Sequence, residues 1–585
     1  MIDRQIPARA WSRQPPWRIL PAPAASLLRD APIVVAGFAL LYALLSVARD
    51  WSAPVDAHVV IQLSLSALPT YALFSVARIA AAYALSLIVA VVYGSVAARS
   101  RVAERLLIPL LDTLQSIPVL SFLPPVMVAM VALFPTRQLG LELGSILLIF
   151  TGQVWNMAFS VYSTTKMIPR DLIDAARIFR LSWWQRFVQL ELPYAAIGLV
   201  WNSMMSVAGG WFFLMACEMF VLGNRDLRLP GLGSYLQTAA NAGDMRAIAW
   251  GVAVMILVIV LIDQLIWRPV IVWSEKFKFE QVEASDAPRS PILALLRQST
   301  IIPRVMRTTV TPIGEALMLH FAAAAFSGGP RRTPRLAGKW AWRALAASAV
   351  VWLAYATGRM GSMLMTLSRP QVGSLLRGAG ATFLRVELTL VLAALWTIPV
   401  GVFVGLRPRL AAIAQPMAQI AASVPATALF PIVVLFLVQL GGGLGTASVI
   451  LLLLGTQWYI LFNVIAGASA IPTDLREVCE VYGLGAGERW RRLLLPGIFP
   501  FLITGFVTAS GGAWNASIVA EYFHLQGRTL SVEGLGAIIS RATDQGDFAT
   551  LLGATVLMAA IVVTMNRLVW RRLFVLATTR FALEN

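Results

Sequence analysis

"DLIDAARIFRLSWWQRFVQLELP", residues 171–193, and "DLREVCEVYGLGAGERWRRLLLP", residues 474–496, are two charged segments of the same layout in an otherwise apolar chain. Each follows an Ile-Pro pair by one residue, and each ends in Leu-Pro. Proline stops the preceding helix and is tolerated in the first turn of the next one, and the first aspartate can cap a helix N-terminus. We therefore predict a short helical hairpin in each segment, polar outside and apolar where Leu and Trp lie on a bundle.

The rest of the chain has the composition of a membrane protein. Its 585 residues are 58% hydrophobic and 13% charged, and its apolar runs approach or exceed the ~20 residues that cross a bilayer as a helix. We predict an all-α polytopic membrane protein with about twelve transmembrane helices. The runs lie at residues 31–48, 71–97, 106–134, 144–163, 194–221, 247–273, 341–358, 377–405, 410–438, 446–466, 497–521 and 549–570.

Basic residues indicate how the chain is oriented. The chain has 47 Lys and Arg against 29 Asp and Glu, a formal net charge of +18. On a soluble protein this charge would suggest a nucleic-acid partner, but here the cations gather in alternate connections, which the positive-inside rule places in the cytoplasm. We predict no nucleic-acid partner and a cytoplasmic position for both termini and both hairpins.

An internal duplication relates the two parts of the chain. A shift of 303 residues superposes Trp155 on Trp458 and Trp211 on Trp514, and a shift of 307 superposes Arg78 on Arg385. Each half has an even number of spans, so we predict two halves related by a pseudo-twofold axis along the membrane normal. The predicted organisation is a basic arm 1–30, a first half 31–273 with its core at 71–273, a basic cytoplasmic linker 274–340, and a second half 341–585 with its core at 377–575.

The two hairpin segments resemble the coupling loop of permease subunits of ATP-binding-cassette importers, whose pattern is E-A-A-x3-G-x9-I-x-L-P. The pattern falls on the following residues: Asp174, Ala175, Ala176, Arg180 and Pro193 in the first half, and Glu477, Val478, Cys479, Gly483 and Pro496 in the second. "GGWFFLMACEMF" (209–220) and "GGAWNASIVAEYF" (511–523), each followed by Gly-Leu-Gly, resemble the nitrate/sulfonate/taurine/bicarbonate branch. Because Arg180 stands where the family has glycine, we expect the first turn to differ from the second, and the two ATPase contacts to be inequivalent.

This resemblance implies a type I importer fold and a permease of the bacterial inner membrane. It implies a small solute, an anion such as nitrate, sulfonate, taurine or bicarbonate, that a periplasmic binding protein delivers and that alternating access moves to the cytoplasm. An ATPase dimer on the cytoplasmic face would grip the two hairpins and bind ATP and Mg. The chain itself has no G-x-x-x-x-G-K-[ST] phosphate loop, so we predict no cofactor and no ATPase activity of its own.

Polar residues inside apolar runs are costly and are candidates for a translocation path or gate. Glu218 and Glu521 are equivalent, and they line a gate, contact the delivering protein, or are interface carboxylates held by a nearby arginine such as Arg225 or Arg528. For Arg78 and Arg385, snorkelling to the interface is favoured over attraction of an anion. The remaining candidates are Gln153, Asn156, Asn202, Trp211, Gln457, Asn463, Trp514 and Asn515. The amide side chains in this list either contact a solute or join helices. Four prolines are expected to kink the third spans: Pro118, Pro124, Pro425 and Pro431.

Other functional classes find little support. Three dispersed histidines and two cysteines provide no metal or nucleophile motif, so an enzyme is disfavoured and no metal site is predicted. An ion-gradient-driven transporter of twelve helices remains an alternative, and it requires acidic residues in mid-span as ion relays.

Overall fold

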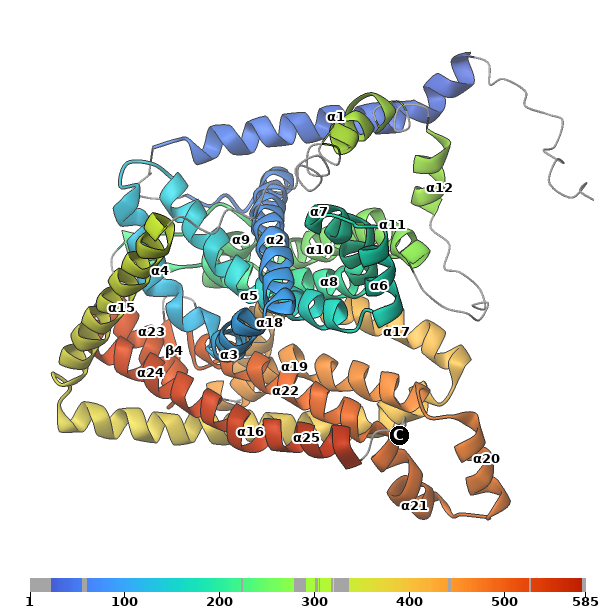
Figure 1. Ribbon diagram of the computed structural model, residues 1–585. Coiled ribbons are helices and arrows are strands. Elements are labelled where there is room, and N and C mark those ends of the chain that lie inside the picture. Colours follow the sequence, from blue (N-terminus) through green and yellow to red (C-terminus); the bar gives the residue numbers. More distant parts are fainter. Residues whose placement is uncertain are drawn as a thin grey trace, which may run out of the picture.

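The computed structural model describes residues 23–54, 60–222, 225–277, 291–299, 304, 306–316, 319, 336–439, 443–525 and 528–580 (Figure 1). Most of the predicted basic arm, parts of the 274–340 linker and the last five residues lie outside these described residues. Helices dominate, as predicted, and two short antiparallel hairpins are added, β1 (Val221–Leu222) with β2 (Arg225–Asp226) and β3 (Tyr522–Leu525) with β4 (Arg528–Ser531).

The first half and the linker contain the following helices: α1 (Pro23–Trp51), η1 (Leu65–Ala67), α2 (Leu68–Arg99), α3 (Arg101–Ser116), η2 (Val119–Phe122), α4 (Leu123–Leu133), α5 (Leu139–Lys166), α6 (Arg170–Ile178), α7 (Trp183–Arg186), η3 (Phe187–Glu191), α8 (Leu192–Glu218), α9 (Leu232–Ala242), α10 (Met245–Ile262), η4 (Asp263–Trp267), α11 (Arg268–Ser274), η5 (Glu275–Phe277), α12 (Pro291–Gln298) and η6 (Met306–Val310).

The second half repeats this order with the following helices: α15 (Leu336–Leu364), α16 (Arg369–Gly405), α17 (Pro408–Ser423), α18 (Ala426–Gln439), α19 (Leu444–Ser469), α20 (Thr473–Val481), α21 (Ala486–Arg489), η7 (Trp490–Leu494), α22 (Leu495–Ala520), α23 (Leu535–Gln545), α24 (Phe548–Met565), η8 (Asn566–Trp570) and α25 (Arg571–Arg580).

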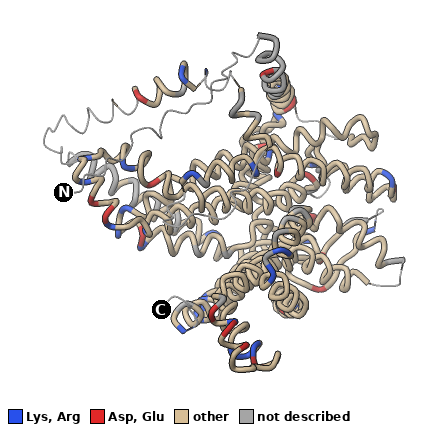
Figure 2. Tube along the Cα trace, turned by 90° about the vertical axis from the view of Figure 1, so that its right-hand side faces the viewer, with Lys and Arg blue, Asp and Glu red and all other residues tan. Residues whose placement is uncertain are grey.

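Eight helices among the described residues are long and apolar enough to cross a membrane, and the bent pair α3 and α4 makes up to nine. The predicted spans at 31–48 and 341–358 lie within the helices α1 and α15, which are not among these candidates. Figure 2 shows long uncharged stretches along the helices between scattered charged residues. The all-α membrane architecture is therefore confirmed.

The third span of each half is broken rather than continuous, so the predictions of single helices over 106–134 and 410–438 are wrong. The axis turns by 86° between α3 and α4. Ile117 and Val424, which precede Pro118 and Pro425, adopt extended backbone conformations. Proline disfavours the helical region for the residue before it, and it also lacks the N–H that a continuing helix needs. The expected kink is therefore a break.

The two halves interlock through these broken spans. The core of each half is a helix trio, α2, α5 and α8 in the first and α16, α19 and α22 in the second. From the first half, η2 contacts α22 and α3 contacts α24; from the second, α17 and α18 contact α8 and α10. At one such contact the Gln419 amide lies 3.0 Å from the Met204 sulfur. Each half therefore completes the packing of the other.

The same Gly-Asp pair follows the last residue of α9 and of α23. Gly243 and Gly546 adopt left-handed φ angles of 66° and 69°, which glycine reaches without a Cβ penalty. The next residue, Asp244 or Asp547, accepts backbone N–H bonds and caps the following helix. Donors from Thr550 hold the pKa of Asp547 below its usual value. The repeated Gly-Asp pair thus fixes a tight turn between two helices in each half.

Candidate functional site

The two predicted hairpins, α6–α7 and α20–α21, have the same shape. Both lie toward the right-hand side of Figure 1, and α23 and β4 lie toward the left. Arg180 has a φ of 51° and Gly483 a φ of 61°. The next N–H closes the same 3.0 Å bond in each hairpin, from Leu181 to the Ala176 carbonyl and from Leu484 to the Cys479 carbonyl. The expectation of a different first turn is wrong, because this cap holds an arginine in the left-handed region at a cost of order 1–2 kcal/mol.

One residue of each Ala-Ala position of the family pattern is buried, while Ala175 is half-buried and Val478 is 48% exposed, and the acidic residues face solvent. Ala176 and Cys479 occupy equivalent buried positions, each 7% exposed. Asp174 and Glu477 are exposed, and Asp174 forms a 2.9 Å ion pair with Arg177 on its own helix. Each hairpin therefore buries one small side chain and presents its carboxylate outward.

A pair of exposed apolar residues follows each carboxylate along the chain, and these pairs were not among the predicted site residues. Ile178 and Phe179 are 79% and 75% exposed, and the equivalent Val481 and Tyr482 are 84% and 77% exposed. Large apolar side chains clustered on a polar surface are typical of an interaction site. The recurrence of an aliphatic and an aromatic residue just before the capped turn was the available signal. We call these two pairs the tip residues.

An ionic contact ties the first hairpin to α2. The Glu191 carboxylate is 2% exposed and lies 2.5 Å from Arg99 Nη2 and 2.9 Å from Arg186 Nε. The Arg99 guanidinium also lies over the rings of Trp183 and Phe187, at 5.9 Å and 5.4 Å. The second half has Leu406 and Leu494 at the positions of Arg99 and Glu191. We call the contact between Arg99 and Glu191 the inner ion pair.

At the opposite end of α8, a buried ion cluster joins α2, α5 and α8. Arg78 is 0% exposed. Its Nε and Nη2 donate to Glu142 at 2.6 Å and 2.7 Å, and its Nη1 donates to Glu218 Oε1 at 2.7 Å. Ser75 Oγ donates to the same Glu218 oxygen at 2.7 Å. A guanidinium that is bidentate to one carboxylate and bonded to a second is the fully satisfied arrangement that a buried arginine requires.

The Gly-Leu-Gly motif forms a cradle for the Glu218 carboxylate. The Gly233 N–H donates to Glu218 Oε2 at 2.7 Å, and the Leu232 N–H donates to Ser75 Oγ at 3.0 Å. The carboxylate thus caps α9, whose first turn has free N–H groups and a positive dipole end. A Cβ on Gly231 would overlap the carboxylate. The φ of Gly231 is 178°, which is extended backbone that any residue can adopt. Glycine is therefore needed here because there is no space for a Cβ, and not because of its backbone conformation.

The second half has the same cradle with fewer charges. Thr382, the counterpart of Ser75, donates to Glu521 at 2.8 Å, and the Gly536 N–H donates to the other oxygen at 2.8 Å. Arg385 Nη1 pairs with Glu521 Oε1, and the arginine side chain is 13% exposed. Where Glu142 completes the first cluster, the 303-residue shift places Gly445. Among the residues that the structure describes, Arg385 therefore has one carboxylate partner where Arg78 has two.

These clusters correct two expectations. Arg78 does not snorkel to an interface, because its guanidinium is fully buried between carboxylates. Glu218 and Glu521 are held by Arg78 and Arg385, not by Arg225 and Arg528. Glu142 was missed because it has no acidic counterpart under the shift that revealed the other residues.

The remaining path candidates differ in their surroundings. Asn202, Asn463 and Asn515 each donate a side-chain N–H to the carbonyl four residues earlier in their own helix. Asn156 is exposed, and Gln457 is 7% exposed. Three of the path candidates have a buried polar atom without a hydrogen-bond partner among the described residues: Gln153 Nε2, Trp514 Nε1 and Asn515 Oδ1.

A glycine pair in α8 lies between Gln153 and the other half. The Gln153 amide fills the space beside Gly210, and the Tyr459 hydroxyl lies 4.0 Å from the position of a Cβ on Gly209. The Tyr459 ring in turn lies against Gly512 of α22. A polar group of each half, the Gln153 amide and the Tyr459 hydroxyl, therefore lies near this glycine pair. Trp211, equivalent to Trp514, is 1% exposed.

Comparison with known families gives the same two halves. The sequence profile of the family described as "Binding-protein-dependent transport system inner membrane component" matches residues 82–266 and, a second time, residues 397–571. The chain belongs to this family. The two matches fall within the two predicted cores, so the chain is a tandem-duplicated permease and a multi-pass membrane protein.

Curated relatives of this permease match it over about the length of one repeat. The bicarbonate transport system permease protein CmpB of Synechococcus elongatus is 27% identical over 197 residues, which is 34% of this chain and 68% of CmpB. The taurine transport system permease protein TauC of Escherichia coli is 26% identical over 34% of this chain and 68% of its own length. The nitrate import permease protein NrtB of Leptolyngbya laminosa is 26% identical over 32% and 64%.

Proposed function

We propose that this permease imports a small solute by alternating access and that separate ATPase subunits drive it by docking on the hairpins α6–α7 and α20–α21. The observation that carries the proposal is that two hairpins of identical cap geometry, with equivalent exposed tip residues, belong to the two family-matched halves. The ATPases would bind ATP and Mg, and a periplasmic binding protein would deliver the solute. On this proposal the protein lies in a bacterial inner membrane with both termini cytoplasmic.

The chemistry of the tips suits insertion into a cleft of a partner protein. Burial of an exposed Phe179 or Tyr482 side chain would contribute ~1.5–3 kcal/mol each. The neighbouring carboxylates Asp174 and Glu477 would provide orientation through charge, since peripheral charges influence register and encounter more than affinity. Together an apolar anchor and a charged rim form the usual anatomy of a specific interface.

A hairpin that moves would carry a long helix with it. Each hairpin continues through a π-turn, η3 or η7, directly into α8 or α22. The 27 residues of α8 correspond to about 40 Å at ~1.5 Å per residue. Glu218 lies at the last residue of this helix, and Trp211 lies two turns earlier. Motion at the ATPase side would therefore reach both the proposed path and the far end.

We place the solute path beside Gly209, where polar groups of both halves meet. Its candidate contacts are the unpartnered atoms of Gln153 and Asn515 and the Tyr459 hydroxyl. A small anion of the class that the relatives' names give, bicarbonate, nitrate or a sulfonate such as taurine, requires donors of this kind, and amide N–H and hydroxyl groups can donate without a fixed charge. The buried arginines are engaged with carboxylates, so they are assigned to structure rather than to solute binding.

Co-purification tests the docking proposal. The permease and its candidate ATPases are expressed together, and association and solute-stimulated ATP hydrolysis are measured for wild type and for Asp174→Lys combined with Glu477→Lys. Reversal of both charges is expected to weaken association by at least about 100-fold, because each lysine would bring a like charge to a site that accepts a carboxylate, at a cost of several kcal/mol. Survival of association and stimulated hydrolysis in this variant would show that the hairpins are not the docking elements.

A matched charge reversal serves as the control. Glu533 is exposed on the opposite end of the second half, next to Arg377 at 3.5 Å. Glu533→Lys changes the net charge in the same direction without touching either hairpin, so it should leave ATPase association unchanged. A panel of nitrate, bicarbonate and taurine, each with its loaded binding protein, then identifies the solute by which one stimulates hydrolysis.

A further inference from the structure

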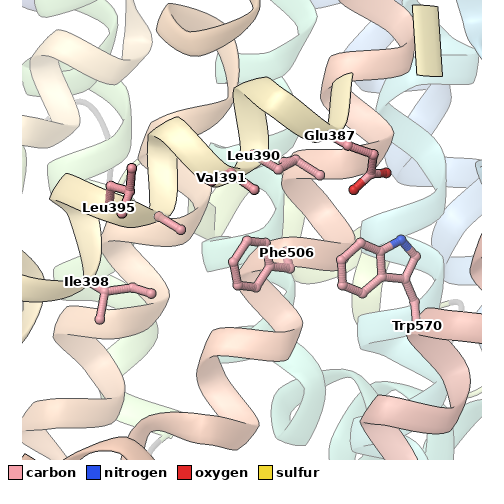
Figure 3. A pocket seen from close by; sticks show the side chains of 8 residues that line it. Glu387, Leu390, Val391, Leu395, Ile398, Phe506 and Trp570 are labelled. Atoms are coloured by element: carbon pink, nitrogen blue, oxygen red, sulfur yellow. The ribbon is translucent and has the colours of Figure 1, made fainter. Parts of the chain in front are cut away.

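The second half contains a pocket that the transport proposal does not use (Figure 3). It holds about 260 Å³ between α16, α22 and η8. Glu387 and the Trp570 indole nitrogen lie at one end, Phe506 lies in the middle, and Leu395 and Ile398 lie at the other end. All three helical segments belong to candidate membrane spans. The pocket is therefore a hollow at membrane depth with one polar end.

The polar end presents one acceptor and one donor. Glu387 Oε1 and Trp570 Nε1 are buried atoms without a hydrogen-bond partner among the described residues. In Figure 3 the carboxylate and the indole nitrogen point toward the same corner. A buried polar atom without a partner costs free energy comparable to a lost hydrogen bond, so two at one corner indicate a missing group that bonds both.

The rest of the lining is apolar and open to the outside of the bundle. Val391 and Leu395 are 55% and 68% exposed, so a molecule dissolved in the bilayer can reach the pocket laterally. The Phe506 and Trp570 rings stack at 5.9 Å with an interplanar angle of 13° and form a flat wall. Cavity surfaces lined by apolar side chains alone stay dry and accept apolar ligands, and the part of this pocket away from Glu387 has such a lining.

At the corresponding place in the first half, different side chains are packed together. Ala80 stands at the position of Glu387. Tyr83, which replaces Leu390, packs edge-on against Trp267 at 5.8 Å and interacts with Ser203, the counterpart of Phe506. Glu387 and Phe506 therefore have no chemical counterparts at the equivalent positions of the first half, which hold Ala80 and Ser203.

We propose that the pocket binds an amphiphilic alcohol from the bilayer, with an apolar chain and one hydroxyl group. The hydroxyl would accept from the Trp570 N–H and donate to Glu387, and the chain would lie along α16 against Phe506. An ammonium group offers donors alone and a carboxylate offers acceptors alone, so neither satisfies both corner atoms. A hydroxyl is the simplest group that does both.

Photolabelling of the full-length protein in lipid nanodiscs tests this assignment. The probe is octanol carrying a diazirine, and labelled peptides are mapped by mass spectrometry. Labelling is expected on residues 390–398 of α16 and on peptides with Phe506 or Trp570, and 1-octanol should compete for it. Octane at equal membrane concentration, which has the chain without a hydroxyl group, should compete at least about fivefold less well, in proportion to one lost hydrogen bond, and octylamine is compared in the same way.

Three variants separate the contributions. Glu387→Ala removes the acceptor and should lower labelling about tenfold, and Trp570→Phe keeps the ring and should lower it about fivefold. Ala394→Leu keeps both polar groups, fills the pocket and should abolish labelling there. Thermal unfolding and gel filtration confirm that each variant is folded.

Two outcomes would overturn the proposal. Equal or better competition by octylamine would make the pocket a site for lipophilic cations. Labelling that is insensitive to Glu387→Ala and Trp570→Phe would mean that the probe only partitions into the bilayer and that a water molecule bridges the corner.

Discussion

The two halves have one fold and two distributions of charge. Both close their hairpin with the same left-handed cap and both hold a carboxylate in a Gly-Leu-Gly cradle. The first half adds Glu142 to the buried cluster and an inner ion pair at Glu191. The second half replaces these with Gly445 and Leu494 and has a half-buried Glu387 in a pocket. Duplication within one chain thus preserved the fold and allowed ionic contacts to concentrate in one copy.

This difference predicts unequal stability of the halves. A first half fastened by ions at both ends of α8 is expected to move as a rigid unit. The second half, with one carboxylate for Arg385 and no inner ion pair among its described residues, is expected to open locally at lower free energy. The variants below make the halves more alike or more different.

The largest expected effect comes from removing the buried arginines. Arg78→Leu leaves Glu142 and Glu218 buried side by side without a cation, so it should destabilise the protein by about 3–5 kcal/mol. Arg385→Leu leaves one carboxylate, still bonded by Thr382 and Gly536, and should cost roughly half as much. The free energy of unfolding is measured by denaturing-detergent titration.

Arg377→Leu, on an exposed arginine of the same helix as Arg385, is the control and should change stability by less than ~0.5 kcal/mol. Equal losses of unfolding free energy for the Arg78 and Arg385 variants would mean that Glu142 adds nothing to stability. The proposed difference between the halves would then be contradicted at this end of α8.

An intermediate effect is expected at the inner ion pair. Arg99→Leu leaves the buried Glu191 with only the partly exposed Arg186, and should cost about 1–2 kcal/mol. Arg99→Leu combined with Glu191→Leu reproduces the apolar pair of the second half and should recover most of that loss. Thermal unfolding of the two single variants and the double variant gives the coupling energy. A coupling energy of zero would contradict an energetic role for this contact.

The smallest effect is expected at the hairpin caps. Arg180→Gly relieves the left-handed arginine and should stabilise the protein by up to about 1 kcal/mol, and Gly483→Ala should destabilise it by a similar amount. No heavy atom lies within 4 Å of a Cβ on Gly483, so the second change tests backbone conformation alone. Opposite signs in thermal unfolding are predicted, and equal signs would show that the two caps are not equivalent.

The sequence predicted the hairpins and the duplication because proline, glycine and capping residues act locally and recur at a fixed shift. Ile168-Pro169 and Ile471-Pro472 fix where each hairpin begins, whatever packs around it. The same local chemistry predicted a kink at Pro118. It did not reveal that the chain would break there, since an 86° turn depends on the other half into which η2 packs.

The ion clusters could not be predicted, because their partners are distant in sequence. Arg78 pairs with residues 64 and 140 positions away, and each charge read alone looked like an interfacial residue. The shifts show that Arg78 corresponds to Arg385 and that Glu218 corresponds to Glu521. An arginine and a glutamate that are both kept in the two halves would have suggested that they form an ion pair. Glu142 and Glu387 have no counterpart, so no repeat signal existed for either.

The most direct test of the functional account is the association of the permease with its ATPases after truncation of both tips. Phe179→Ala combined with Tyr482→Ala removes two exposed rings and no charge, and Met365→Ala, on a side chain 88% exposed at the start of the second half, is the control. We predict at least about a 100-fold weaker association for the double variant, loss of solute-stimulated hydrolysis, and no change for the control. Unchanged association and hydrolysis in a folded double variant would contradict the account.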